Sequence, residues 1–115
     1  MRVLVCGGRD FDDSYLFWEY MDNLRAEGMD HIISGGARGA DHLAEMYADR
    51  EEINIDVYPA DWEKFGKSAG YIRNKQMLIE GRPDLVIAFP GGKGTAMMVK
   101  LAKEAGVPVK EVMGP

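Results

Sequence analysis

Only one cysteine, Cys6, occurs among the 115 residues, so no disulfide can form within the chain. Long apolar runs are also absent, because no stretch approaches the roughly 20 residues that a membrane-spanning helix requires. The first apolar segment, residues 3–6, is too short for a signal peptide and is typical of a buried strand. These absences exclude a disulfide-stapled scaffold and a membrane-spanning protein, and they favour a cytoplasmic one.

Positive charge is in deficit as well, since 14 lysines and arginines face 19 acidic residues and the formal net charge is -5. A protein that binds nucleic acid without sequence preference is expected to be basic, so this balance disfavours a nucleic-acid partner. It does not exclude a local cationic pocket for a small anion.

Metal ligands and catalytic histidines are scarce. The two histidines, His31 and His42, have no cysteine or carboxylate at ligand spacing, so no metal site is predicted. Ser34 likewise has no histidine at a spacing that would make it a nucleophile.

What the sequence does contain is a regular alternation of strand-like and helix-like segments. Strands are expected at 2–6, 31–34, 54–59, 84–89 and 107–112, and helices at about 13–27, 40–50, 68–80 (ending at Gly81) and 95–106. Alternation with short connections predicts an α/β fold with a five-stranded, mainly parallel sheet and helices on both faces. The length predicts a single domain over residues 1–115. The alternating pattern of the third strand indicates a sheet edge.

The first helix carries a wide apolar stripe. Phe17, Met21 and Leu24 recur at helical spacing, and Leu16, Trp18 and Tyr20 widen the arc. A broad core stripe is the favoured interpretation. The alternative is a contact between subunits of a homo-oligomer, and this helix is where such a contact is expected.

Residues 90–95, Pro-Gly-Gly-Lys-Gly-Thr, join an apolar strand to a helix. Backbone amides in such a turn and the positive end of the helix can hold a phosphate. The spacing is not that of a P-loop, because Lys93 is followed by Gly94. Nor is it the dinucleotide fingerprint, because Met97 stands where the third glycine belongs. A plain tight turn from strand to helix is the alternative interpretation.

Two further glycine turns follow the first and second strands, at 7–10 and 34–41. The carboxyl ends of parallel strands share one edge of a sheet, so all three turns are expected on one rim. The residues after the third strand, 60–70, are polar and irregular, which indicates a loop over this rim. Five cations are expected there: Arg9, Arg38, Lys67, Arg73 and Lys93. Together they predict a small anionic ligand.

Several side chains near this rim keep two interpretations. Asp41 alone is interpreted as a carboxylate that stabilises the first turn of its helix. The alternative is that Asp41 and Asp10 bind a ribose hydroxyl, and this role is favoured when the two residues are considered as a pair. Arg73, in a partly apolar neighbourhood, needs a partner, which is a phosphate, Asp10 or Asp41. Trp62 is a core anchor or stacks on an adenine, and the core is preferred.

Four motifs in order give the chain a family resemblance: Gly7-Gly8-Arg9-Asp10, Ser34-Gly35-Gly36-Ala37-x-Gly39-Ala40-Asp41, Ala69-Gly70-x-x-Arg73-Asn74-x-x-Met77 and Pro90-Gly91-Gly92-x-Gly94-Thr95. Across its whole length the chain resembles the SLOG superfamily, and within it the YspA-like, YpsA-related branch. The superfamily also includes the LOG-type phosphoribohydrolases and the DNA-uptake protein DprA. The resemblance implies a Rossmann-like, three-layer domain and a nucleotide or nucleotide-derived ligand related to NAD or ADP-ribose.

The resemblance is incomplete at one position. LOG enzymes carry a catalytic glutamate three residues after the threonine of the last motif, and here that residue is Met98, on the buried face of its helix with Ala102 and Ala105. A phosphoribohydrolase needs a carboxylate near the ribose. Catalysis would therefore fall to Asp10, Asp41 or Glu45 together with Arg73.

The leading hypothesis is a module that senses or sequesters a small phosphate-bearing ligand, with no other cofactor, no metal and no membrane partner. The alternative is a nucleotide-processing hydrolase whose catalytic carboxylate has moved. A DprA-like mode of binding single-stranded DNA is disfavoured by the acidic balance and the small size. The predicted ligand-binding residues are Gly7, Gly8, Arg9, Asp10, Ser34, Gly35, Gly36, Arg38, Gly39, Asp41, Arg73, Asn74, Pro90, Gly91, Gly92, Lys93, Gly94 and Thr95.

Overall fold

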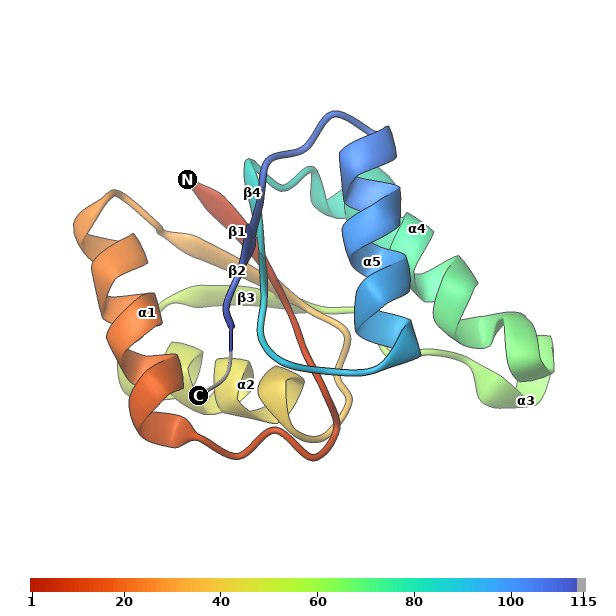
Figure 1. Ribbon diagram of the computed structural model, residues 1–115, viewed down its shortest axis with the longest axis horizontal. Coiled ribbons are helices and arrows are strands. Elements are labelled where there is room, and N and C mark those ends of the chain that lie inside the picture. The colour runs from red at the N-terminus through yellow and green to blue at the C-terminus, as the bar shows by residue number, and fades with distance from the viewer. Residues whose placement is uncertain (114–115) are drawn as a thin grey trace.

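The computed structural model describes residues 1–113 and has a five-stranded sheet at its centre (Figure 1). The strands are β1 (Arg2–Cys6), β2 (His31–Ser34), β3 (Asn54–Val57), β4 (Leu85–Ala88) and β5 (Val109–Glu111). Their order is β3-β2-β1-β4-β5, and every neighbouring pair is parallel. The expected parallel sheet is confirmed, and β3 lies at an edge as its alternating pattern predicted.

Helices cover both faces of the sheet, which gives three layers. One face holds α1 (Ser14–Ala26) and α2 (Ala40–Arg50), and the other holds α4 (Ala69–Gly81) and α5 (Lys93–Glu104), as Figure 1 shows. A single helical turn, α3 (Trp62–Phe65), and a short 3₁₀ helix, η1 (Gly66–Ser68), precede α4. None of the helices in residues 1–113 is long and apolar enough to cross a membrane.

The position of β1 in the centre of the sheet explains why its residues 3–6 are all apolar. Val3 and Val5 pack under α1 and α2, whereas Leu4 and Cys6 pack under α4 and α5. Successive side chains of a strand point to opposite faces, so a strand covered on both faces needs apolar residues at every position.

The apolar stripe of α1 lies against the core. Phe17, Met21 and Leu24 are fully buried, and Leu16, Trp18 and Tyr20 are partly buried and pack on the same cluster. The packing therefore accounts for the width of the stripe.

One local prediction was wrong and another was confirmed. Residues 60–70 were expected to be irregular but contain α3 and η1, because Asp61 caps α3 by accepting from the amide of Lys64 at 3.0 Å. The helix expected to end at Gly81 does end there, since α4 spans Ala69–Gly81, and a side chain at Gly81 would crowd Ile33. The residue that follows the helix, Arg82, is its C-cap and takes a left-handed conformation at φ 46°.

The last helix, α5, also differs from its prediction. It begins at Lys93 instead of Thr95, because Gly92 already acts as its N-cap and the amide of Ala96 donates to the Gly92 carbonyl at 3.0 Å. Met98 and Ala102 are buried as expected, but Ala105 is exposed because it lies beyond the last helical turn.

The three glycine turns meet at the carboxyl end of the sheet, where the chain switches from one side of β1 to the other. The amide of Gly8 donates to the carbonyl of Pro90 at 2.9 Å, and the carbonyl of Gly8 accepts from the amide of Ala40 at 3.3 Å. A Cβ on Gly8 would lie 3.0 Å from Gly91 Cα, so only glycine allows this approach. In doubly wound folds, this switch point is where ligands bind.

Candidate functional site

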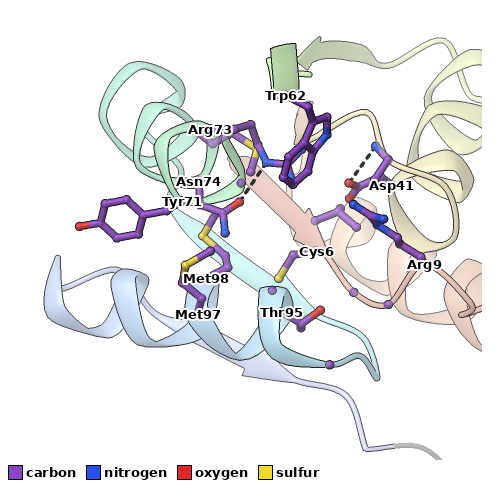
Figure 2. A pocket seen from close by; sticks show the side chains of 18 of the residues that line it. Cys6, Arg9, Asp41, Trp62, Tyr71, Arg73, Asn74, Thr95, Met97 and Met98 are labelled. Atoms are coloured by element: carbon purple, nitrogen blue, oxygen red, sulfur yellow. Dashed lines mark hydrogen bonds between the residues drawn. The ribbon is translucent and has the colours of Figure 1, made fainter. Parts of the chain in front are cut away.

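A cleft of about 490 Å³ opens at the ends of β1 and β4, between the glycine turns and the start of α4 (Figure 2). Its volume lies within the range of about 300–1,000 Å³ that small-molecule sites usually have. The lining residues are Val5, Cys6, Gly7, Gly8, Arg9, Ala37, Asp41, Trp62, Lys67, Gly70, Tyr71, Arg73, Asn74, Met77, Gly92, Gly94, Thr95, Met97 and Met98. We call this cavity the main cleft.

One wall of the main cleft is cationic. Arg9, from the first glycine turn, places its guanidinium 5.8 Å from the ring centroid of Trp62. That distance lies within the range of a cation–π contact. Trp62 is half exposed, so the preferred interpretation of this residue as a core anchor was wrong. Its place on the one-turn helix α3 holds the indole over the rim instead of in the core.

Arg73 extends from α4 into the same region. Its Nη1 donates to the carbonyl of Gly35 at 2.6 Å, and its Nε donates to the side-chain oxygen of Asn74 at 3.1 Å. Burial lowers the pKa of Arg73, and the nearby carboxylate of Asp41 opposes that shift. Within residues 1–113 no carboxylate lies within 4 Å of the guanidinium, so its direct partners are neutral oxygens.

Asp41 stands in the first turn of α2 and is 8% exposed. Its carboxylate accepts from the amide of Ala37 at 3.2 Å, which pins the second glycine turn (Figure 2). Burial raises the pKa of Asp41 to about 6, although the Ala37 amide and Arg73 both favour the ionised form. The chain's own carboxylate therefore occupies the Ala37 amide of this turn.

The opposite side of the main cleft is apolar and rich in sulfur. Cys6, Met97 and Met98 lie together there in Figure 2, and Val5 and Met77 complete the wall. Burial raises the pKa of the Cys6 thiol to about 12, with Asp41 adding to the shift. A thiol in that state stays neutral near pH 7 and is a poor nucleophile, so Cys6 contributes a packing surface.

The third glycine turn leaves the N-terminus of α5 open. Gly92 caps the helix without any side-chain hydrogen bond, and Gly92, Gly94 and Thr95 all line the main cleft. Amides in the first turn of a helix have no acceptor within that helix. A Cβ on Gly92 or Gly94 would meet nothing within 4 Å. The open amides and the positive end of α5 therefore face free space.

The structure distributes the predicted ligand-binding residues over three places. Those that line the main cleft are Gly7, Gly8, Arg9, Asp41, Arg73, Asn74, Gly92, Gly94 and Thr95. Gly35, Gly36 and Arg38 line a second cavity next to it, which Arg9 and Arg73 also reach. Asp10, Ser34, Gly39, Pro90, Gly91 and Lys93 line neither cavity.

The predicted residues that line neither cavity lie on the surface or have contacts within the protein. Asp10 pairs with Arg38 at 3.4 Å on the exposed surface, and Lys93 is exposed at the start of α5. Ser34 is fully buried, and its hydroxyl donates to the carbonyl of Asp41 at 3.4 Å. Gly39 takes a φ of 78°, and a side chain there would overlap the Gly8 carbonyl.

Sequence reasoning missed part of the lining. Val5, Cys6, Tyr71 and Met97 were not proposed, and Met98 was assigned only to the core. Apolar residues at a strand end or in the first turns of a helix are predicted to lie in the core. The periodicity of the sequence shows which face of an element is buried, but it does not show whether that face also lines a cavity. No group of three or more histidines, cysteines or carboxylates that could hold a metal occurs in the described part of the chain.

Comparison with known proteins adds three findings. The model of the family YAcAr, described as the YspA, cpYpsA-related SLOG family, matches residues 1–65. The Gene 61 protein of Mycobacterium phage D29 is 38% identical over 117 aligned residues, which cover 94% of this chain and 93% of the phage protein. No solved structure matches the chain significantly.

Proposed function

The chain belongs to the YspA, cpYpsA-related SLOG family, and from that membership we propose that it binds a small nucleotide or nucleotide-derived ligand in the main cleft. In this proposal it acts as a sensing or sequestering module. The ligand class is that of NAD or ADP-ribose, with at least one phosphate.

The observation that carries the proposal is the open N-terminus of α5 beside an amphipathic cleft. Helix N-termini without a side-chain cap attract anions, because their amides and the helix dipole act in the same direction. A phosphate would lie over Gly92, Gly94 and Thr95. The rest of the ligand would extend between the methionine wall and Trp62, where a base or a ribose finds apolar surface.

Calorimetry with a panel of nucleoside monophosphates, nucleoside diphosphates, NAD and ADP-ribose tests the proposal. We expect at least one of them to bind, and Gly92→Val to abolish the binding because the added side chain occupies the position of the phosphate. The fold should persist, since a Cβ at this position meets no other atom within 4 Å. Ala96→Val is the matched control, because Ala96 is exposed on the same helical turn and lines neither cavity.

A panel in which nothing binds would overturn the proposal. So would a folded Gly92→Val variant that binds as tightly as the wild type, because the phosphate would then not lie on the third turn.

A second candidate function, hydrolysis of an N-glycosidic or phosphate bond, is favoured by one observation. Asp41 is a carboxylate in the main cleft with its pKa raised to about 6, which suits a general acid or base near neutral pH. Mass spectrometry of the same incubations separates the two functions. Bound but unchanged ligand supports the binding module, whereas released base or ribose phosphate that disappears in Asp41→Asn supports the hydrolase.

A further inference from the structure

A second cavity of about 360 Å³ adjoins the main cleft. Its lining residues are Arg9, Gly35, Gly36, Ala37, Arg38, Pro59, Ala60, Trp62 and Arg73. We call it the arginine cavity, because its only charged side chains are three arginines. Four of its residues, Arg9, Ala37, Trp62 and Arg73, also line the main cleft, so the two spaces share one wall.

The arginines of this cavity keep their charge available. Among residues 1–113, Arg9 and Arg73 have no carboxylate within 4 Å, and Arg38 has only the 3.4 Å contact with Asp10. In that pair the side chains are 74% and 95% exposed, so water screens the attraction and the pair is weak. Three guanidinium groups around one space form a site for a multiply charged anion.

The positions of the strands relate the arginine cavity to the open turn of α5. The cavity lies at the end of β2, the open turn follows β4, and β1 runs between them. Neighbouring strands are about 4.8 Å apart, so the two strand ends are separated by about 10 Å. Gly8 is hydrogen-bonded to both sides, to Pro90 at 2.9 Å and to Ala40 at 3.3 Å, so only this one turn lies between them. A nucleotide held at α5 can thus carry a second charged group to the arginines.

We propose that the arginine cavity is a second anion subsite, which takes a further phosphoryl group of the nucleotide whose first phosphate lies at the N-terminus of α5. The inference rests on the proposed function and raises the requirement from at least one phosphate to two phosphoryl groups in the ligand. The second group is attached either to the first phosphate or to the ribose. Arg38 then determines specificity, because it lines only the arginine cavity.

Calorimetry with the adenine and guanine series tests the subsite, using the 5′-monophosphate, the 5′-diphosphate and the 3′,5′-bisphosphate of each. We expect the diphosphate or the bisphosphate to bind about tenfold more tightly than the monophosphate, as an added charge-assisted contact implies. The member that gains affinity identifies where the second phosphoryl group is attached.

Variants assign that gain to the cavity. Arg38→Gln should remove most of the tenfold difference, whereas Asp10→Asn should increase the difference about twofold by releasing Arg38 from its pair. Arg82→Gln, which removes an exposed arginine between α4 and β4, is the matched control and should leave the difference unchanged.

The outcomes separate the two proposals. Monophosphates that bind while the second phosphoryl group adds nothing, or an Arg38→Gln variant that weakens all three ligands equally, would overturn the subsite and leave the proposed function in place. Failure of all the nucleotides to bind would overturn both.

Discussion

At the scale of single residues, Asp41 is the group most changed by its surroundings. It lies beside the main cleft at the start of α2, and burial raises its pKa from 3.8 to about 6. The folded protein therefore holds this proton more tightly than the unfolded chain does. Between about pH 4 and pH 6 folding is linked to proton uptake, so the contribution of Asp41 to stability falls as the pH rises through that window.

Replacing Asp41 with asparagine should make this linkage visible. The variant cannot ionise, so its stability relative to the wild type should rise between pH 4 and pH 6 and level off above pH 7. The rise should approach about 3 kcal/mol, from roughly two pKa units at 1.36 kcal/mol each. Urea denaturation of both proteins at pH 4, 5, 6 and 7 measures it, because every other titrating group cancels in the difference. A constant difference across this range would contradict the raised pKa.

The role of a residue could be predicted from the sequence where it depends on neighbouring residues in the chain. Three glycine turns after strands predicted one rim, and the structure brings turn residues such as Gly8 and Gly92 to the same cleft. Trp62 and Cys6 could not be assigned in this way. Whether a large apolar side chain fills the core or lines a cavity depends on which elements pack beside it, and that information is not local.

At the scale of elements, α5 combines two tasks. Its N-terminus opens onto the main cleft, while Met98, one turn later, is 1% exposed and packs in the core with Leu4 and Val86. Members of the LOG group carry a catalytic glutamate at this position of the motif. In this chain that position holds a buried methionine, which packs in the core and also forms part of the wall of the main cleft.

We expect Met98→Glu to destabilise the protein by about 3 kcal/mol or more, because a buried carboxylate without a partner loses its hydration. It should also fail to release base from nucleoside monophosphates. Urea denaturation and mass spectrometry measure the two effects. Met98→Leu is the control, since a swap of similar volume costs less than about 1.5 kcal/mol. A stable and active Met98→Glu variant would contradict this prediction.

The same scale shows which elements the sequence could predict. Long segments with clear periodicity, such as α1 and α2, were predicted within one or two residues. The short α3 was missed because a single turn is too brief to show a period, and its stability depends on the Asp61 cap. The end of α4 at Gly81 was predicted correctly, whereas the crowding of Gly81 by Ile33 depends on tertiary packing and could not be read from the sequence.

At the scale of the whole molecule, charge is divided unevenly. The chain carries a formal net charge of -5, yet Arg9, Arg38 and Arg73 gather around two adjoining cavities. The small anion that we propose as ligand would enter those cavities without covering the acidic remainder of the surface. A long polyanion would have to lie across it, which is unfavourable.

Single-stranded DNA should therefore bind poorly. In fluorescence anisotropy with a labelled thymidine 20-mer at physiological salt, we expect no saturation up to about 100 µM protein, the weak limit of non-specific binding. The nucleotide that binds most tightly in calorimetry serves as the positive control. Micromolar binding of the oligonucleotide that weakens steeply with salt would instead support a DprA-like mode.

The order of the strands has a consequence for how the cleft comes into being. β1, β2 and β3 are neighbours in both sequence and sheet, so the first 57 residues contain one side of the sheet, and residues 85–111 add the other side along β1. During synthesis the cleft does not exist until β4 has joined β1 and the turn after it has closed on Gly8. A ligand that touches both sides would hold the late half of the chain to the early half. Occupancy of the cleft would thus report that synthesis has passed the first turns of α5, which complete the lining.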